Sequence, residues 1–253
     1  MSDSLLIECG NTRSKWGRLG KQGIAEPGVC AYAELSDAAA LARAWQSAGA
    51  YGRVRIASVS TNPLVEEALA LLRQAQDAPI IPLSTRQDYR GLHIAYEQPE
   101  TLGVDRWLAM LAAIEGSQRA ICVVDVGTAM TVDVVTAERL HLGGQIIPGL
   151  ELMRNSLHHG TGLLPRIEGR EGKALLGKDT ASCIAVGTLS ALAGTVNLIR
   201  QEMAYLGEIH GIITGGNARD VLPLLQGQWD HRPHLVLEGM AVIDRNDEMG
   251  DAL

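Results

Sequence analysis

Two short segments of this sequence repeat the same order of residue types, and this repeat limits the folds that the chain can adopt. The segments are Leu6–Thr12 and Val123–Ala129. In each, an apolar stretch reaches a carboxylate (Glu8 or Asp125), followed by one residue, a glycine and a small hydrogen-bonding residue. We therefore expect a duplicated unit of strand, acidic turn and strand, and two similar α/β halves that face each other across a cleft.

The composition agrees with a compact chain of two such halves. Of its 253 residues, 46% are hydrophobic and none is Phe, so Leu, Val, Ile and Ala must form the core. A chain of this size can bury about seven tenths of its surface, so no disulfide or metal is needed to hold it together. We place the boundary near Glu115–Gln118, which gives an N-terminal half of residues 1–116 and a C-terminal half of residues 117–253.

Short β-type runs alternate with helical patterns along both halves. Apolar runs predict strands at Ser4–Cys9, Lys15–Leu19, Arg53–Ser60, Pro79–Leu83, Ala120–Val124, Thr131–Val135, Leu142–Ile147, Gly211–Thr214 and His234–Leu237. Helical spacing and start signals predict helices at Asp37–Gln46, Pro63–Ala75, Val104–Ile114, Gly149–Leu157 and Thr180–Tyr205, and one more after each of the last two strands.

The helix expected at Thr180–Tyr205 is long, and its apolar residues follow a spacing of three and four. It also contains Gly187 and Gly194, each of which lowers helix stability by about 1 kcal/mol relative to Ala. We expect this loss to be offset by the close approach of another backbone, such as that of a second subunit.

The net charge and the cysteines exclude several classes of protein. The formal net charge is −7 and there is no basic stripe or helix-turn-helix pattern, so we expect no nucleic-acid partner. No apolar run approaches the roughly 20 residues that span a bilayer, and no signal-peptide pattern starts the chain, so we expect no membrane partner. The four cysteines form no C-x-x-C pair and three lie in apolar stretches, which predicts buried, reduced thiols and a cytoplasmic location.

The two acidic turns are suited to hold a nucleotide. A glycine lets a phosphate approach the backbone, and consecutive amides in a tight turn form a cradle for an anion. Asn11, Thr12 and Thr128 would add donors, and the carboxylate at each strand end can hold Mg²⁺ directly or through water. The same residues are also compatible with two ordinary β-hairpins whose acidic residues cap the turns.

The segment Leu102–Trp107, at the start of an expected helix, is a second candidate. Here Asp105 can act as a general base for a hydroxyl group, while Arg106 holds an anion through two parallel hydrogen bonds. The alternative is a helix cap with a surface ion pair. Gly143–Gly149 and Thr214–Asn217 are either turns or places where the backbone approaches a ligand.

Two other patterns are not assigned a function: the first is interpreted as coincidental, and the second as a pair of solvated side chains. Gly172–Lys178 matches most of a P-loop, but Asp179 occupies the position of the Ser or Thr that binds Mg²⁺, and the preceding segment is polar. His158 and His159 are adjacent, a spacing that cannot place two metal ligands on one helix face.

Taken together and in order, these segments resemble the type III pantothenate kinases, a branch of the superfamily of acetate kinase, sugar kinases, Hsp70 and actin. The resemblance covers nearly the whole chain. It is carried by Glu8–Thr12, Tyr96-x-x-Pro-x-x-Leu-Gly-x-Asp-Arg106, Asp125-x-Gly-Thr-Ala-x-Thr-x-Asp133, Gly143-Gly-x-Ile-x-Pro-Gly149, Thr180 followed by Gly187, and Thr214-Gly-Gly216. It implies an α/β fold of two duplicated ribonuclease H-like (actin-like ATPase) domains, each a mixed sheet flanked by helices, with a cleft between them.

The resemblance also implies phosphorylation of (R)-pantothenate by ATP to 4′-phosphopantothenate, the first step of coenzyme A biosynthesis, by a homodimer. Asp105 is then the catalytic base. The implied substrate pocket consists of Tyr96, Gly103, Val104, Asp105, Arg106 and, from the second subunit, Thr180. The implied ATP site consists of Glu8, Gly10, Asn11, Thr12, Lys15, Gly127, Thr128, Gly215 and Gly216. Asp125 and Glu8 are the implied ligands of Mg²⁺, and a monovalent cation (K⁺ or NH₄⁺) is required.

The sequence departs from the family pattern at two positions. Glu8 stands where the family has Asp, and Ile94 stands where the family has Asn. The longer acid at residue 8 changes the geometry of a metal site, and Ile94 removes a hydrogen-bonding side chain near the pocket. Two alternatives remain: a relative that acts as an accessory factor in transcription with little or no turnover, and a kinase for another small alcohol.

Overall fold

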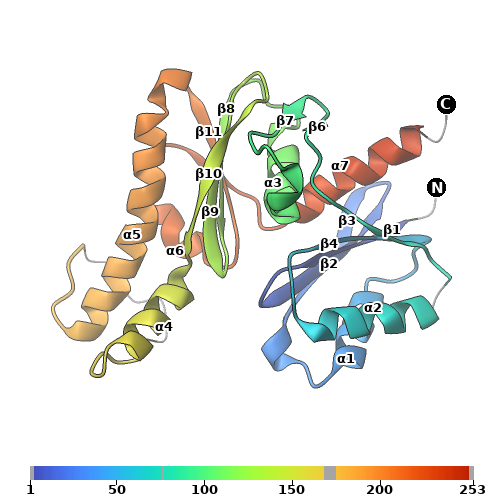
Figure 1. The fold of residues 1–253 in the computed structure, drawn as a ribbon, viewed down its shortest axis with the longest axis horizontal. Coiled ribbons are helices and arrows are strands. Elements are labelled where there is room, and N and C mark those ends of the chain that lie inside the picture. The colour runs from blue at the N-terminus through green and yellow to red at the C-terminus, as the bar shows by residue number, and fades with distance from the viewer. Residues whose placement is uncertain (1–2, 76, 168–174, 251–253) are drawn as a thin grey trace. The chain divides into compact units, whose positions relative to one another are not determined.

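The computed structural model of the protein describes residues 3–75, 77–167 and 175–250. Contacts divide the chain into two compact units (Figure 1). Unit 1 comprises Met1–Tyr89, Tyr96–Glu115 and His234–Leu253, and unit 2 comprises Arg90–Ala95 and Gly116–Pro233. The C-terminal segment therefore packs within unit 1, whereas the sequence-based division assigns it to the C-terminal half; that division stays a proposal.

Unit 1 contains a five-stranded mixed sheet. Its strands are β1 (Ser4–Cys9), β2 (Arg13–Gly20), β3 (Gly23–Ala31), β4 (Arg53–Ser58) and β5 (Ile80–Pro82), in the order β3-β2-β1-β4-β5. The central strand β1 pairs antiparallel with β2 and parallel with β4. Helices α1 (Ala38–Gln46) and α2 (Pro63–Ala75) cover one face, where Leu5, Ile7 and Trp45 belong to one buried cluster (Figure 1).

Unit 2 repeats this topology. Its strands are β8 (Ala120–Val126), β9 (Ala129–Val135), β10 (His141–Pro148), β11 (Ile209–Thr214) and β12 (Trp229–His231), in the order β10-β9-β8-β11-β12. The central strand β8 again pairs antiparallel with the next strand, β9, and parallel with β11. The α/β fold of two mixed sheets predicted from the repeated acidic turn is therefore confirmed.

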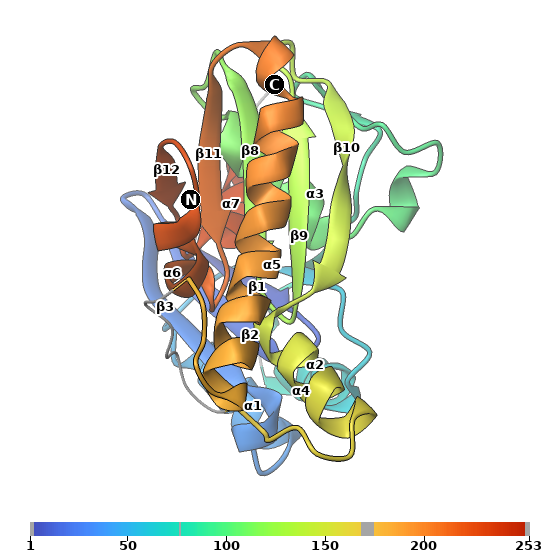
Figure 2. The same ribbon diagram turned by 90° about the vertical axis from the view of Figure 1, so that its left-hand side faces the viewer.

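Helices α4 (Leu150–Gly160), α5 (Thr180–Glu202) and α6 (Ala218–Val221) pack on the second sheet. Figure 2 shows α5 lying along the strands. Its apolar residues meet the sheet because Leu189, Leu192 and Val196 recur at helical spacing and are buried. The predicted amphipathic helix is thus confirmed, although its α-helical part ends at Glu202 and a 3₁₀ turn, η3 (Ala204–Leu206), follows.

Two further helices belong to unit 1. Helix α3 (Val104–Ile114) is buried along almost its whole length, and α7 (Leu235–Gly250) packs against it and against β1. A side chain at Gly239 of α7 would collide with the backbone of Leu108 in α3, so the two helices are in close contact. The remaining short elements are η1 (Tyr32–Glu34), η2 (Pro99–Thr101), η4 (Leu222–Leu224), β6 (Asp88–Tyr89) and β7 (Leu92–His93).

One predicted element is wrong. Residues His234–Leu237 were expected to form a strand, but Leu235 starts helix α7. A short apolar run is compatible with a buried strand or a buried helix, and the buried Met240 and Ile243 further along complete a helical spacing. Strand β3 was not predicted, because it contains two glycines and a proline, and neither was the three-residue β12.

The prediction that no segment is long and apolar enough to cross a membrane does not hold for α5. Its 23 residues include an 18-residue window with a mean hydropathy of 1.6. However, 44% of that window is buried inside the protein, helices of soluble proteins pass the same test of length and composition, and Leu189, Leu192 and Val196 of α5 pack in the buried cluster of the second sheet. We therefore assign α5 to the core of unit 2.

The cysteines are free thiols and only partly follow the prediction that they are buried. Cys9 and Cys122 are buried, Cys30 is half-buried and Cys183 is exposed on α5. Burial raises the pKa of Cys9 and of Cys122 to about 12, so both stay protonated at neutral pH.

Candidate active site

The first acidic turn joins β1 to β2 in unit 1. It is tight, because the backbone N–H of Gly10 donates a hydrogen bond of 3.0 Å to the carbonyl of Arg13. The carbonyl of Thr12 accepts a hydrogen bond of 3.0 Å from the N–H of Tyr32. The side chains of Asn11 and Thr12 are exposed. The turn thus carries an exposed carboxamide and an exposed hydroxyl group, which are donors of the kind that bind a phosphate.

Glu8 and Lys15 lie side by side next to this turn. They are directly opposite each other on β1 and β2, and Lys15 Nζ is 3.6 Å from Glu8 Oε1. Glu8 is buried, with 9% of its surface exposed, and Lys15 is partly exposed. Burial and, to a smaller degree, the positive charge of Lys15 lower the pKa of His234, the residue just before α7.

The second acidic turn joins β8 to β9 in unit 2, and distant backbone groups hold it. Within the turn, the N–H of Gly127 donates to the carbonyl of Ala129 at 3.1 Å. From outside, the N–H of Gly149 donates to the carbonyl of Thr128 at 3.0 Å, and that of Asn217 donates to the carbonyl of Val126 at 3.1 Å. A side chain on Gly149 would collide with the backbone carbonyls of Gly127 and Thr128.

Gly215 completes this site from the end of β11. Its φ angle of +96° and its closeness to Asp125 both require a glycine, because a Cβ atom there would lie 2.5 Å from Asp125 Oδ1. A Cβ atom on Gly127 would lie 3.3 Å from the same oxygen. Gly216 follows, exposed, at the start of α6. The structure therefore gathers five of the predicted residues at one end of the second sheet: Asp125, Gly127, Thr128, Gly215 and Gly216.

Asp105 lies in the first turn of α3, where it accepts a hydrogen bond of 2.8 Å from the N–H of Arg106. Gly103 caps the helix, and a Cβ atom there would lie 2.5 Å from Asp105 Oδ1. The carboxylate is therefore packed over a bare backbone position, and it is partly exposed. The alternative of a simple surface cap does not fit the neighbouring Arg106, which is only 6% exposed.

The guanidinium of Arg106 is fixed by an aromatic partner. Its NH1 group donates a hydrogen bond of 3.0 Å to the hydroxyl oxygen of Tyr96, and its Cζ atom lies 5.9 Å from the centre of the Tyr96 ring. Val104, between Asp105 and the cap, is buried with 8% of its surface exposed. Val104 therefore packs in the core, while Tyr96, Asp105 and Arg106 supply the polar groups of this site.

Val59 connects the start of α3 with the first acidic turn. The N–H of Val59 donates a hydrogen bond of 2.9 Å to the carbonyl of Cys9, the residue before Gly10. A side-chain methyl of Val59 lies 3.8 Å from the Cβ position of Gly103. The carboxylate of Asp105 and the donors of the first turn therefore belong to one neighbourhood within unit 1, which no spacing in the sequence indicates.

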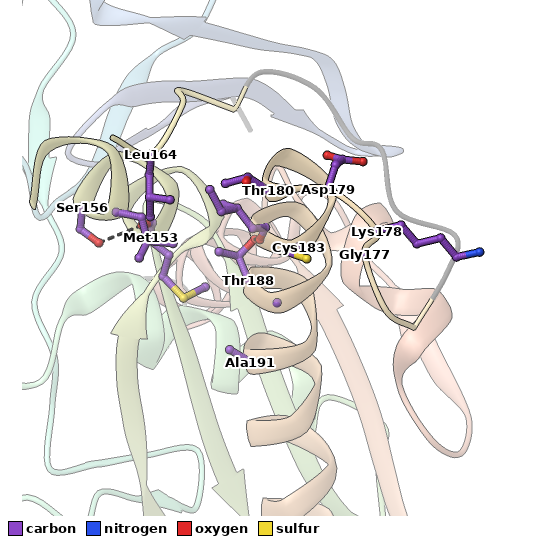
Figure 3. A pocket seen from close by; sticks show the side chains of 13 residues that line it. Met153, Ser156, Leu164, Gly177, Lys178, Asp179, Thr180, Cys183, Thr188 and Ala191 are labelled. Atoms are coloured by element: carbon purple, nitrogen blue, oxygen red, sulfur yellow. Dashed lines mark hydrogen bonds between the residues drawn. The ribbon is translucent and has the colours of Figure 1, made fainter. Parts of the chain in front are cut away.

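Thr180 lines a pocket of unit 2 between α4 and the N-terminal half of α5 (Figure 3). The cavity measures about 800 Å³, and its walls are mostly apolar, with Met153, Leu157 and Leu164 on one side and Ile184 on the other. None of the residues of the acidic turns lines it. Thr180 is exposed and lines this pocket of unit 2, and none of the other predicted substrate residues is among the pocket's lining residues.

The P-loop-like segment ends beside this pocket. Residues 172–174 lie outside the described residues, and the described part, Leu175–Lys178, leads into α5. Asp179 is the N-cap of that helix and forms a capping box with Ser182. Hydrogen bonds from the backbone and hydroxyl of Ser182 lower the pKa of Asp179. The interpretation of this motif as coincidental agrees with the role of Asp179 as a helix cap.

The adjacent histidines are engaged with backbone carbonyls. Nδ1 of His158 lies 2.8 Å from the carbonyl of Leu164, and Nδ1 of His159 lies 2.8 Å from that of Asn155. Among the described residues, no three His, Cys, Asp or Glu side chains are grouped to hold a metal ion by themselves. A divalent ion that accompanies a nucleotide needs fewer protein ligands, because phosphate oxygens and water complete its shell. The partly exposed carboxylate of Asp125 is of a suitable type for such an ion.

Comparison with known sequences connects these features to one family. A family model described as type III pantothenate kinase matches residues 4–202. The chain is 37% identical to a type III pantothenate kinase of Nitrosococcus oceani over 252 residues, which covers 96% of this chain and 94% of that one. It is 35% identical to a type III pantothenate kinase of Halorhodospira halophila over 251 residues, covering 96% and 98% of the two chains.

Solved structures agree on the fold. A protein of Campylobacter jejuni described as a Baf family transcriptional activator matches with a TM-score of 0.60 at 19% identity, covering 96% of this chain and 98% of that one. A Sinorhizobium meliloti protein described as a 2-dehydro-3-deoxygalactonokinase also gives 0.60 at 14% identity, covering 96% of each chain. An archaeal actin homolog gives 0.51 at 10% identity, covering 96% and 99%. The duplicated units are thus those of the actin-like ATPase and sugar kinase fold. On this evidence the chain belongs to the type III pantothenate kinase family, and it is an ATP-dependent kinase of a small-molecule substrate.

Proposed function

We propose that the protein transfers the terminal phosphoryl group of ATP to the primary hydroxyl of (R)-pantothenate, forming 4′-phosphopantothenate in coenzyme A biosynthesis. The observation that carries this proposal is the link through Val59 between the Asp105 carboxylate and the first acidic turn. A base for an alcohol and a cradle for phosphates in one neighbourhood are the two parts that phosphoryl transfer requires. The family of its relatives supports pantothenate as the alcohol.

Asp105 accepts the proton of the substrate hydroxyl. Its Oδ1 atom accepts a hydrogen bond from the N–H of Arg106, which fixes the orientation of the carboxylate. General-base catalysis of this type contributes about 10²- to 10⁴-fold to the rate. Arg106, held by Tyr96, orients the substrate through a charged, planar donor group. Gly103 and the backbone of Val104 form the adjoining wall, and Thr180 of a second subunit completes the pocket.

The two acidic turns bind ATP. In unit 1, Gly10 lets the phosphates approach the backbone of the turn, and Asn11, Thr12 and the ammonium of Lys15 contact phosphate oxygens. In unit 2, Gly127 and Thr128 do the same, and Gly215 and Gly216 lie against the adenosine. Asp125, and Glu8 directly or through water, are the carboxylates for Mg²⁺, which neutralises charge on the phosphates when bound. A monovalent cation, K⁺ or NH₄⁺, is also required.

The active species is a cytoplasmic homodimer with α5 at the interface. Along the outward side of α5, Gly187 and Gly194 have no described atom of their own chain within 4 Å of a Cβ position. The two glycines suggest that another backbone packs closely against α5. The described part of this chain supplies no such backbone, and this supports a second copy of the chain as its source. The exposed Leu198, on the same side, adds apolar surface for such a contact.

A coupled assay of ADP release tests the proposed reaction. Purified protein should release ADP from ATP only when pantothenate is present, and mass spectrometry should detect phosphopantothenate. Activity should require Mg²⁺ and rise with K⁺ or NH₄⁺. Turnover with another small alcohol but not with pantothenate would contradict the choice of substrate.

An accessory factor in transcription is the second candidate, because one structural neighbour carries that description. The net charge of −7 disfavours direct contact with DNA. Filter binding at moderate salt separates the two functions: tight, salt-sensitive binding of DNA together with an absence of ADP release would favour the regulatory role.

A further inference from the structure

We infer that Glu8 is a positioning residue for Lys15 and that it holds the Lys15 ammonium where the phosphates of ATP bind, independently of any metal ion. This inference rests on the proposed function. The role follows from the pairing of Glu8 with Lys15 and from the length of the glutamate side chain at this position. The role acts through Lys15, so it persists when no divalent ion is present.

The register of the first hairpin places the two side chains together. Glu8 and Lys15 are directly opposite each other on antiparallel strands, a position in which oppositely charged side chains interact. Lys15 Nζ lies 3.6 Å from Glu8 Oε1, and the two side chains are only 20% and 12% exposed, respectively. Water therefore screens this pair less than it would a surface pair.

The backbone around Glu8 is fixed, so side-chain length decides whether the contact forms. The buried Ser14 donates a hydrogen bond of 3.1 Å from its hydroxyl to the carbonyl of Glu8. The indole N–H of Trp45 donates in turn to Ser14 Oγ at 3.0 Å. An Asp at position 8 would draw the carboxylate back by about 1.5 Å, the length of one carbon–carbon bond. The gap to Lys15 would then exceed the usual limit of about 4 Å for an ion pair, unless the lysine moved.

The surroundings of Lys15 show where its charge acts. Its ammonium contributes to lowering the pKa of His234, after burial as the larger cause, while Glu238 has the opposite effect. The lysine charge therefore reaches both β1 and the start of α7. The carboxylate of Glu8 lies beside the first turn, because Glu8 is paired with Lys15 near the end of β1.

Electrostatics alone predicts the opposite effect of removing Glu8. A carboxylate near a phosphate site repels the ligand, so neutralising it should tighten the binding of ATP. If Glu8 instead holds Lys15 in place, its neutralisation should weaken that binding, because the charge-assisted contact from Lys15 is lost. The sign of the change therefore separates the two effects.

A double-mutant cycle measures this role. The affinity for ATP is measured by calorimetry for the wild type, Glu8→Gln, Lys15→Met and the double variant, once with excess chelator and once with Mg²⁺. We expect each single variant to bind ATP about tenfold more weakly without metal, the size of one contact to a charged group. The double variant should be no weaker than Lys15→Met. Glu8→Asp should fall between the wild type and Glu8→Gln.

Control variants and opposite outcomes complete the test. Glu26→Gln breaks the exposed pair of Glu26 with Arg18, at 3.8 Å, and should leave the affinity for ATP unchanged. Unfolding midpoints confirm that each variant is folded, and Glu8→Asp replaces Glu8→Gln in the cycle if the latter is not. Tighter ATP binding by Glu8→Gln, additive effects in the cycle, or an effect seen only with Mg²⁺ would each overturn the inference. A wild type that binds no ATP would overturn the proposed function itself.

Discussion

At the scale of single residues, two glycines of unit 2 leave the room that the side chain of Asp125 occupies. Gly127 follows it in the turn, and Gly215 reaches it from the end of β11, where any side chain would meet Asp125 Oδ1. The same carboxylate is the proposed ligand of Mg²⁺. A change of one hydrogen atom to a methyl group at Gly215 should therefore disturb the metal and nucleotide site.

Gly215→Ala should lower the affinity for Mg²⁺-ATP by at least tenfold, since both the positive φ angle and the contact with Asp125 oppose a Cβ atom. Gly116→Ala is the matched control: Gly116 has a φ of +73°, but no described atom lies within 4 Å of its Cβ position. Calorimetric titration of both variants measures the effect. Equal losses in the two variants would show that backbone strain, and not crowding of Asp125, is responsible.

Several site residues could be predicted from the sequence, and others could not. The acidic turns and the Tyr96–Arg106 motif are local patterns in the sequence. In the structure, the residues of each pattern lie close to one another. The links made by Val59 and Asn217 depend on backbone groups far away in the sequence. Backbone hydrogen bonds leave no signal in residue type, which is why Val59 was missed and Asn217 was predicted only as the end of the Thr214–Asn217 segment.

At the scale of elements, α7 is held to the first sheet by a buried charge network. Asp244 accepts hydrogen bonds from Ser4 Oγ at 2.8 Å and from Arg55 Nε at 2.9 Å, and Arg53 Nε lies 3.3 Å from it. Asp244 and Arg55 are 3% and 4% exposed. Because a buried charge without a partner is unfavourable, this network should fix α7 on β1 and β4.

Asp244→Ala should lower the free energy of unfolding by about 3–5 kcal/mol, because it leaves the buried Arg55 without this partner. Asp247→Ala removes an exposed partner of the same arginine, at 2.8 Å, and should have an effect of about 1 kcal/mol or less. Urea denaturation of the two variants gives both values. Similar effects for the two would contradict a dominant role for the buried pair.

The first turn of α5 should lose stability in acid. Hydrogen bonds from Ser182 lower the pKa of Asp179 below its ordinary value of 3.8, so the ionised cap stabilises the folded state above that pH. This contribution is lost as the pH falls through the lowered pKa. The difference in melting temperature between the wild type and Asp179→Ala should thus be constant near neutral pH and shrink below about pH 4. A difference independent of pH would contradict an ionised cap.

The elements that sequence reasoning missed have physical causes. Strand β3 contains Pro27 and two glycines and lies at the edge of its sheet, where weak strand formers are tolerated. In contrast, the bounds of α2 and α3 agree with the prediction, because an N1 proline starts one and a glycine cap precedes the other. The error at His234–Leu237 arose from an apolar run too short to show its period.

At the scale of the whole molecule, the repeated acidic turn predicted the duplicated topology. Each copy of the turn joins the central strand of its sheet to the antiparallel strand that follows it. What no repeat within one chain can show is a second subunit. Only the two glycines of α5 indicated one, and the described residues leave their Cβ positions without neighbours.

Gly194→Leu should convert the proposed dimer to a monomer, because a large side chain would keep the second backbone away from α5. Light scattering after gel filtration measures the mass. Glu67→Leu, an exposed position on α2 of the other unit, is the control and should remain dimeric. A Gly194→Leu variant that keeps the mass of a dimer would place the interface elsewhere.

The central claim is that Asp105 is the base of a pantothenate kinase. The most direct test compares the rate of pantothenate-dependent ADP release by Asp105→Asn with that of the wild type and of Glu100→Gln, an exposed acid of the preceding η2 turn. We expect the rate to fall by about 10²- to 10⁴-fold for Asp105→Asn, with its melting temperature and ATP affinity unchanged, and not to change for Glu100→Gln. Turnover of Asp105→Asn at the wild-type rate would contradict the account.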